Sequence, residues 1–227
     1  MLALHGLDVV GLEISEKGAE VAREYAEAEL AGPHSYNFES TEWGTQGSAG
    51  KVQVIPGDFF KRGWEADACV GDGFDLIYDY TVSTRRIDLF LPGEECRGSP
   101  RSFLSRDLPL LTFGASRAWQ FLCALHPSMR RDWARRMGEL LSPSGILVCL
   151  EFPLFKEPGE PGPPWPLRGV HWNLLAEGGD GLDCDGTERA DNEKGSFVRE
   201  ERYKPSRSYK QGRDTDMISV WRLKPER

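Results

Sequence analysis

The sequence lacks any apolar run long enough to span a lipid bilayer, and its start has no signal-peptide pattern. It also lacks a stripe of Lys and Arg with interleaved aromatic residues. Its net charge of −8 argues against nucleic acid or an anionic membrane as a partner. These absences predict a cytoplasmic globular protein with no nucleic-acid or membrane partner.

Cysteine and histidine are few and scattered. The five cysteines contain no CxxC pair and no Cys/His spacing typical of metal ligands, and the four histidines are equally dispersed. An odd number of unclustered cysteines is typical of reduced thiols in the cytosol. We therefore expect neither disulfides nor a metal site.

The chain has the length of one domain and alternates apolar strand patterns with amphipathic helix patterns. Such alternation indicates βαβ units and an α/β fold with a mostly parallel sheet. Strands are expected at residues 8–15, 52–55, 74–80 and 146–152, helices at 16–31 and 127–141, a turn at 142–145, a short helix near 172–176, and a closing antiparallel pair at 198–204 and 217–223.

The first residues read as the end of a helix. Residues 2–5 form a last turn that Gly6 can close as a C-cap. A helix end that leads into a buried parallel strand implies an earlier strand and loop. We therefore expect a chain that is truncated at its N-terminus and lacks the first strand of its sheet.

Acidic side chains follow three of the predicted strands where each strand ends: Glu13, Asp58 and Asp79. Ligands of open α/β sheets bind at this carboxyl edge, where an acid commonly binds ribose hydroxyls. Phe59 beside Asp58 would add an apolar surface of the kind that an adenine requires. Singly, Glu13 could be a water-exposed strand end, and Asp58 could cap a turn whose Phe59 fills the core. Three acids in register predict a nucleoside-containing cofactor.

Four segments together carry a family resemblance: residues 9–16 (VVGLEISE), 57–60 (GDFF), 74–81 (FDLIYDYT) and 161–165 (PGPPW). They resemble the thiopurine methyltransferase family, and most closely its halide/thiol methyltransferase branch. The resemblance implies a class I methyltransferase fold, Rossmann-like with an antiparallel C-terminal edge, that uses S-adenosyl-L-methionine. It implies a single methyltransferase-like domain over residues 1–227.

The resemblance also implies roles for individual residues. Glu13 would bind the ribose hydroxyls with Ile14 beside it, and Asp58 and Phe59 would flank the adenine. The methionine portion and the transferable methyl would lie next to Asp79 and Tyr80. The acceptor pocket would be walled by Pro163, Pro164, Trp165 and Arg168. The proline-rich segment alone is also compatible with a solvent-exposed polyproline link.

The implied acceptor is a small soft nucleophile: a thiol, hydrosulfide or halide. Such a nucleophile needs little general-base help, because a thiol with a pKa of about 8.5 is already partly ionised near neutral pH. Asp79 is a candidate catalytic base, although contact with the cofactor explains its position equally well. We expect a monomer whose partners are the cofactor and this small acceptor.

Two features depart from the family pattern. The glycine-rich loop of class I methyltransferases, which lets backbone amides approach the cofactor, is absent. Residues 82–120 form an irregular insertion rich in Arg, Ser and Pro where the family runs directly on to residues 121–125 (FLCAL). We interpret this block as an intron retained in frame, because Val82-Ser83 can be encoded by a GTAAGT donor and Gln120 by the CAG of an acceptor. A genuine lid or regulatory insertion is the alternative.

Two other functions remain open at this point. A methyltransferase-like domain without its first strand and glycine loop could be degenerate, with neither cofactor binding nor activity. An NAD-dependent dehydrogenase is the third possibility, since an acid at the end of the second strand suits both cofactors.

Overall fold

The computed structural model describes residues 2–33, 49–68, 71–79, 121–182, 184, 186–188, 194–206, 208, 212 and 214–225. Tyr80 and the predicted insertion at 82–120 lie outside these residues. The elements along the chain are η1 (Leu2–His5), β1 (Val9–Glu13), α1 (Glu16–Ala31), β2 (Val52–Pro56), α2 (Trp64–Asp67), β3 (Phe74–Asp79), α3 (Phe121–Ala124), η2 (Pro127–Met129), α4 (Arg130–Leu140), β4 (Leu141–Glu151), α5 (Val170–Trp172), η3 (Asn173–Glu177), β5 (Phe197–Tyr203) and β6 (Met217–Leu223).

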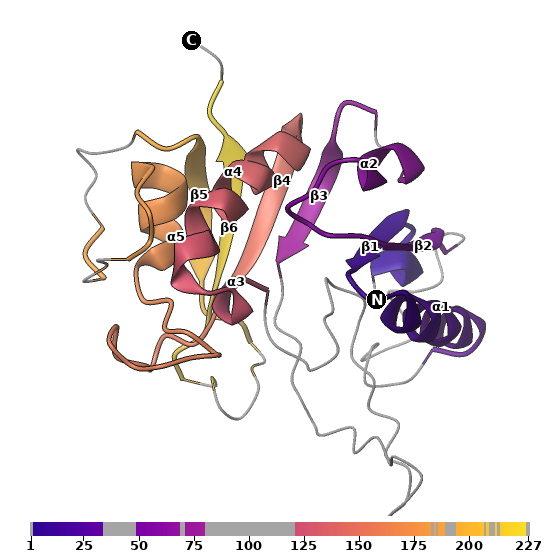
Figure 1. Cartoon of the computed structure of the whole chain (residues 1–227), viewed down its shortest axis with the longest axis horizontal. Coiled ribbons are helices and arrows are strands. Elements are labelled where there is room, and N and C mark those ends of the chain that lie inside the picture. The colour runs from indigo at the N-terminus through magenta and orange to yellow at the C-terminus, as the bar shows by residue number, and fades with distance from the viewer. Residues whose placement is uncertain are drawn as a thin grey trace, which may run out of the picture.

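The described strands form two hydrogen-bonded sheets (Figure 1). One is the parallel pair β1-β2, and the other is a four-stranded sheet in the order β3-β4-β6-β5. In the larger sheet β3 and β4 are parallel, and β6 runs antiparallel to both β4 and β5. The predicted Rossmann-like α/β fold with an antiparallel C-terminal edge is confirmed. The sheet divides between β1 and β3, the strands that end in Glu13 and Asp79.

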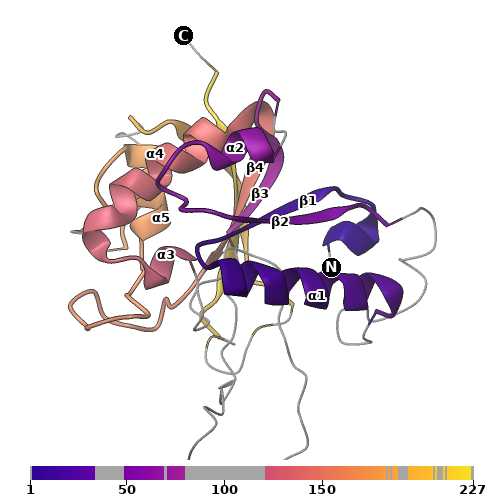
Figure 2. The ribbon, with the colours of Figure 1, turned by 45° about the vertical axis from the view of Figure 1, so that its right-hand side comes forward.

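Helix α1 begins and ends where the sequence predicts. The Ser15 hydroxyl accepts the Gly18 backbone N–H at 3.2 Å, which satisfies a donor that the first turn otherwise leaves free. The helix lies along the β1-β2 pair and buries Ala19 and Ala26 (Figure 2). Val21 of the same helix is 40% exposed.

The predicted helix at 127–141 is divided into the short η2 and the longer α4. Its apolar side, which includes Trp133 and Met137, is buried as predicted. Two of its basic residues, Arg130 and Arg136, are buried as well. Both guanidinium groups donate to backbone carbonyls of distant segments, and this compensates for their loss of water.

Strand β4 begins earlier than the sequence indicates. Residues 142–145, predicted as a turn, lie within β4, where the pairing register with β3 shifts between Phe74 and Leu76. A Cβ at Gly145 would lie 2.5 Å from the Phe74 carbonyl oxygen, so the irregular pairing requires glycine there.

One hydrophobic core joins both sheets. It includes Leu12 and Ile55 from the β1-β2 pair and Ile77, Leu147 and Trp221 from the four-stranded sheet. Within the described residues β1 and β3 each pair with one neighbouring strand only. Side-chain packing, rather than a continuous backbone ladder, therefore connects the two sheets.

Candidate functional site

The carboxyl ends of β1 and β2 meet at one edge. Glu13 pairs with Pro56 in the parallel register, and the Gly57 N–H donates to the Glu13 carbonyl at 2.8 Å. Asp58 follows directly, so the fold brings two of the three predicted acids, Glu13 and Asp58, to the same edge.

The Glu13 side chain is buried and held in one orientation. Its Oε1 accepts the Ser15 backbone N–H at 3.0 Å. Burial raises the pKa of this carboxyl above its ordinary value, and the hydrogen bond from Ser15 partly opposes that rise. A Cβ at Gly18 would lie 2.8–2.9 Å from three side-chain atoms of Glu13. The first turn of α1 therefore leaves room for the carboxylate only because residue 18 has no side chain.

Ile14 presents an apolar surface next to this carboxylate. Its side chain is 66% exposed, although it directly follows a buried strand. An exposed large apolar residue beside a positioned acid is a surface that a partly apolar ligand can cover.

Asp58 begins a tight turn after β2. Its Oδ1 accepts the Phe60 N–H at 3.0 Å, and its Oδ2 lies 3.6 Å from Lys61 Nζ. Phe59 is buried in the core, with its ring edge-on to Phe60 and to Phe121. Asp58 therefore caps a turn and Phe59 fills the core, as in the alternative interpretation of these two residues. The role of Asp58 and Phe59 at an adenine stays a prediction.

Asp79 ends β3 and is almost fully buried. Burial raises the pKa of its carboxyl to about 7, and the nearby Trp133 side chain partly lowers it. The Trp133 indole N–H does not form a hydrogen bond with Asp79, and Asp79 Oδ2 has no hydrogen-bond partner within the described residues. The His171 ring lies edge-on to Trp133 at 6.0 Å, and burial lowers the pKa of His171 to about 4. Asp79 therefore lies in a buried environment beside the aromatic side chain of Trp133.

The segment predicted to wall the acceptor is an ordered loop. Lys156 Nζ donates to the carbonyls of Pro161 and Pro164 at 2.6 and 2.9 Å. The Trp165 N–H donates to the Cys123 carbonyl at 2.8 Å, and its ring lies edge-on to His126. This contact network shows a fixed loop rather than a solvent-exposed polyproline link.

Two further residues of this loop were predicted at the acceptor pocket. Pro163 is exposed at the loop surface. The Arg168 guanidinium donates to the Leu154 carbonyl at 3.3 Å and lies 3.4 Å from Glu157. Arg168 thus closes the base of the loop, and its role toward an acceptor stays a prediction.

Helix α3 connects the Asp58 turn with this loop. Phe121 contacts the rings of Phe59 and Phe60, and the carbonyl of Cys123 holds Trp165. The Asp58 turn, α3 and the proline loop are therefore continuous. Asp79 belongs to the other sheet from Glu13, and the convergence of all three acids on one ligand stays a prediction.

Sequence reasoning did not identify Gly18, Trp133, Arg136 or His171. Gly18 carried a signal, because glycine in the first turn of a helix is costly relative to alanine and needs a local reason. Trp133 and Arg136 looked like ordinary core and surface positions of an amphipathic helix. The contacts that matter here, of Trp133 with Asp79 and of Arg136 with the Phe59 carbonyl, join residues more than 50 positions apart in sequence, so no local pattern could reveal them.

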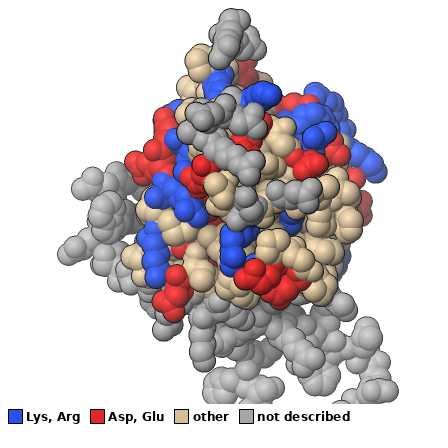
Figure 3. All heavy atoms as spheres, turned by 90° about the vertical axis from the view of Figure 1, so that its left-hand side faces the viewer, with Lys and Arg blue, Asp and Glu red and all other residues tan. Residues whose placement is uncertain are grey.

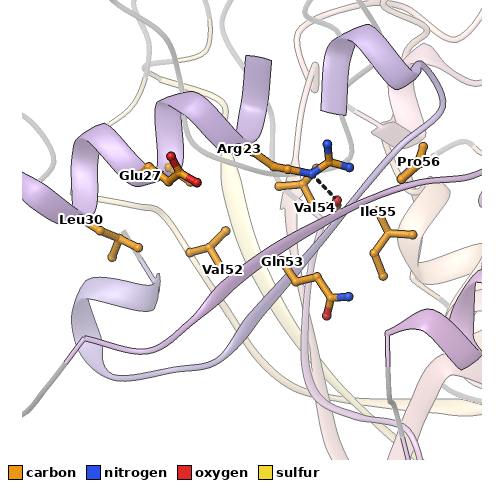
Figure 4. A pocket seen from close by; sticks show the side chains of 9 residues that line it. Arg23, Glu27, Leu30, Val52, Gln53, Val54, Ile55 and Pro56 are labelled. Carbon is orange, nitrogen blue, oxygen red and sulfur yellow. Dashed lines mark hydrogen bonds between the residues drawn. The ribbon is translucent and has the colours of Figure 1, made fainter. Parts of the chain in front are cut away.

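A separate groove of about 440 Å³ lies between α1 and β2 (Figure 4). It is lined by Arg23, Ala26, Glu27, Leu30, Val52, Gln53, Val54, Ile55 and Pro56. Arg23 Nε donates to the Val54 carbonyl at 3.0 Å, so part of the backbone of β2 is already satisfied there. The lining does not include Glu13 or Asp58, and the groove is therefore distinct from the acidic edge.

Charges of both signs lie together on one face of the molecule (Figure 3). On the face shown in Figure 3, Lys and Arg side chains are interspersed with Asp and Glu. In the part of the chain that the structure describes, no three His, Cys, Asp or Glu side chains are grouped so that they could hold a metal ion. No helix in that part has the length and apolar character needed to cross a membrane.

The fold and the acidic edge thus define a Rossmann-like α/β protein. No protein-family model matches the chain. It is 41% identical over 68 residues to an Arabidopsis thaliana protein named "Probable thiol methyltransferase 2", which covers 28% of this chain and 29% of that protein. It is 27% identical over 157 residues to "Thiocyanate methyltransferase 1" of Brassica oleracea, which covers 69% of this chain and 41% of the relative.

A crystal structure of a Pyrococcus horikoshii protein aligns with a TM-score of 0.42 and 16% identity over 96% of this chain and 73% of that one. The chain spans 29% and 41% of the lengths of the two plant relatives. The chain is therefore similar in sequence to methyltransferases over part of their length.

Proposed function

We propose that this chain binds S-adenosyl-L-methionine and belongs to a protein that transfers the methyl group to a thiol, hydrosulfide or halide. The observation that carries the proposal is the Glu13 carboxylate, held by Ser15, accommodated by Gly18 and placed at the same edge as Asp58. The partial similarity to thiol and thiocyanate methyltransferases supports the same class of reaction.

The residues present fit the nucleoside half of this cofactor. Only Oε1 of Glu13 has a hydrogen-bond partner among the described residues, so Oε2 is available to accept from a ribose hydroxyl. The exposed Ile14 offers an apolar face for the base. Among the described residues, Asp58 Oδ2 is paired with Lys61 Nζ at 3.6 Å, an exposed side chain, and Oδ2 can accept from an exocyclic amine.

When bound, the cofactor supplies a methyl group on a positively charged sulfur. A soft anionic acceptor then needs orientation and the exclusion of water more than it needs a base. The proline loop, fixed by Lys156 and by the Cys123 carbonyl, is the element that we assign to this task. Asp79 is retained as the candidate base, because burial raises the pKa of its carboxyl to about 7 and it can accept a proton near neutral pH.

Calorimetric titration with S-adenosylhomocysteine tests the proposal. We expect micromolar binding, little binding of NAD, and a loss of about 1.5–3 kcal/mol in Glu13→Ala, as for a lost charge-assisted hydrogen bond. Glu20→Ala is the matched control, because Glu20 is an exposed acid on the adjoining helix α1, where it pairs with Lys17. Equal affinity of wild type and Glu13→Ala, or a preference for NAD, would refute the assignment of Glu13.

A second candidate is a methyltransferase-like domain that no longer binds the cofactor. The observation that favours it is the divided sheet, since β1 and β3 share no backbone ladder within the described residues. A folded chain that fails to bind S-adenosylhomocysteine would establish this alternative. A labelled-methyl assay over a panel of thiols and halides, on this chain and on a version without residues 82–120, identifies the acceptor if binding is found.

A further inference from the structure

Arg136 is a buried guanidinium on a helix whose neighbouring arginine is in water. The Arg136 side chain is 3% exposed, whereas that of Arg135 is 56% exposed. A buried cation is costly unless hydrogen bonds and counter-charges replace its water. The groups that replace this water around Arg136 therefore indicate its role.

Two of those contacts are carbonyl oxygens of the turn after β2. Arg136 Nε donates to the Phe59 carbonyl at 3.0 Å, and Nη2 donates to the Lys61 carbonyl at 3.4 Å. These residues lie more than 70 positions away in sequence. One guanidinium thus holds both sides of the turn that begins at Asp58, and its planar, forked geometry suits two separate acceptors.

The same side chain is fixed from its other side. Arg136 pairs with Glu65 on α2 and lies 3.3 Å from Glu139, which in turn lies 2.8 Å from Arg62. Its guanidinium also lies over the ring of Trp64 at 5.7 Å. The segment from Phe59 to Glu65 is therefore attached to α4 mainly through Arg136, with Glu139 adding the ion pair to Arg62.

The attachment of this turn to α4 bears on the orientation of the Asp58 carboxylate. Asp58 Oδ1 accepts the Phe60 N–H within the turn that Arg136 holds, so a shift of the Phe59 carbonyl moves the carboxylate as well. We propose that Arg136 is a positioning residue that orients Asp58 toward the exocyclic amine of an adenine base. This inference rests on the proposed function, since it assigns Asp58 to the base of the cofactor.

The test is a comparison of two ligands on folded protein. S-adenosylhomocysteine has an exocyclic amine, and S-inosylhomocysteine has a carbonyl oxygen in its place. We expect wild type to prefer the adenosyl ligand by about tenfold or more, as for a charge-assisted hydrogen bond. In Arg136→Met this preference should fall close to one, mainly through loss of affinity for the adenosyl ligand. Arg136→Lys, which keeps a donor but not the fork, should lie between the two.

Arg135→Met is the matched control and should keep the wild-type preference. A purely structural role of Arg136 would weaken both ligands by the same factor and leave the preference unchanged, which would overturn the inference. Arg136→Lys serves the same purpose if Arg136→Met does not fold. Wild type that binds both ligands equally also overturns the inference, while wild type that binds neither refutes the proposed function itself.

Discussion

Asp79 and His171 are both buried near Trp133, and burial shifts their protonation in opposite directions. The pKa of Asp79 rises from 3.8 to about 7, so between these values the folded chain holds a proton that the unfolded chain releases. The contribution of Asp79 to stability is therefore complete below about pH 4 and is lost as the pH rises through about 7.

His171 contributes with the opposite sign. Its pKa falls from 6.5 to about 4, with burial as the main cause, so the unfolded chain binds the extra proton in this range. Its contribution is present above about pH 6.5 and is lost as the pH falls toward about 4. The two residues oppose each other between these limits, and above pH 6.5 only the Asp79 effect still changes with pH.

Asp79→Asn should remove the loss of stability with rising pH that Asp79 causes. We expect the free energy of unfolding of Asp79→Asn, relative to wild type, to increase steadily from pH 4 to about 7 and then stay constant. Urea unfolding at half-unit pH steps measures this difference. His171→Gln is the companion variant and should change the profile only below about pH 6.5. Parallel profiles for wild type and Asp79→Asn would show that Asp79 is not held neutral by burial.

The position of Asp79 was predictable, and its environment was not. A carboxylate at the end of a buried parallel strand is visible in the pattern of residues 74–80. Its near-neutral pKa depends on Trp133 and on burial by α4, which come from a segment more than 50 residues later. Sequence distance, rather than any ambiguity of the local pattern, limited the prediction.

At the scale of elements, the junction of β1 with α1 is almost entirely local. Ser15 caps the helix and its backbone N–H binds Glu13, while Gly18 leaves space for the same side chain. Each of these three contacts lies within five residues, and accordingly the bounds of α1 agree with the sequence prediction. The turn expected at 142–145 is instead part of β4, because β3 supplies its pairing partner. Arg136 is buried because the Phe59 turn supplies an acceptor for its guanidinium, which no local pattern indicates.

Gly18→Ala separates stability from ligand binding at this junction. Alanine is favoured over glycine in a helix by up to about 1 kcal/mol, so the helix itself should gain stability. The new Cβ would lie 2.8 Å from Glu13 Cγ and force the carboxylate to move. We expect unfolding to be unchanged or slightly harder, while affinity for S-adenosylhomocysteine falls about tenfold, a change that thermal unfolding and calorimetry measure on the same sample.

The control is the same substitution in a Glu13→Ala background. There the added methyl group meets no carboxylate, and affinity should not fall further. An equal additional loss in both backgrounds would mean that Gly18 acts on something other than Glu13.

At the scale of the whole molecule, the two sheets differ in how their strands are supported. β4 and β6 each pair on both sides, whereas β1 and β2 each pair on one side within the described residues. Regions with fewer backbone partners open at lower free energy. We expect native-state hydrogen exchange to show a lower opening free energy for amides of β1 and β2 than for those of β4 and β6. Equal values would show that the shared core alone makes the two sheets one cooperative unit.

If the cofactor binds as proposed, the divided sheet gives it a structural role in addition to its chemical one. A ligand held at one end by Glu13 on β1 and at the other by Asp79 on β3 would act as a cross-link between two units that otherwise cohere only through their side chains. Binding of the cofactor would then protect amides throughout β1, α1 and β2 from hydrogen exchange, including amides that lie far from the ligand contacts. In such a chain, the cofactor would complete the fold as well as the chemistry.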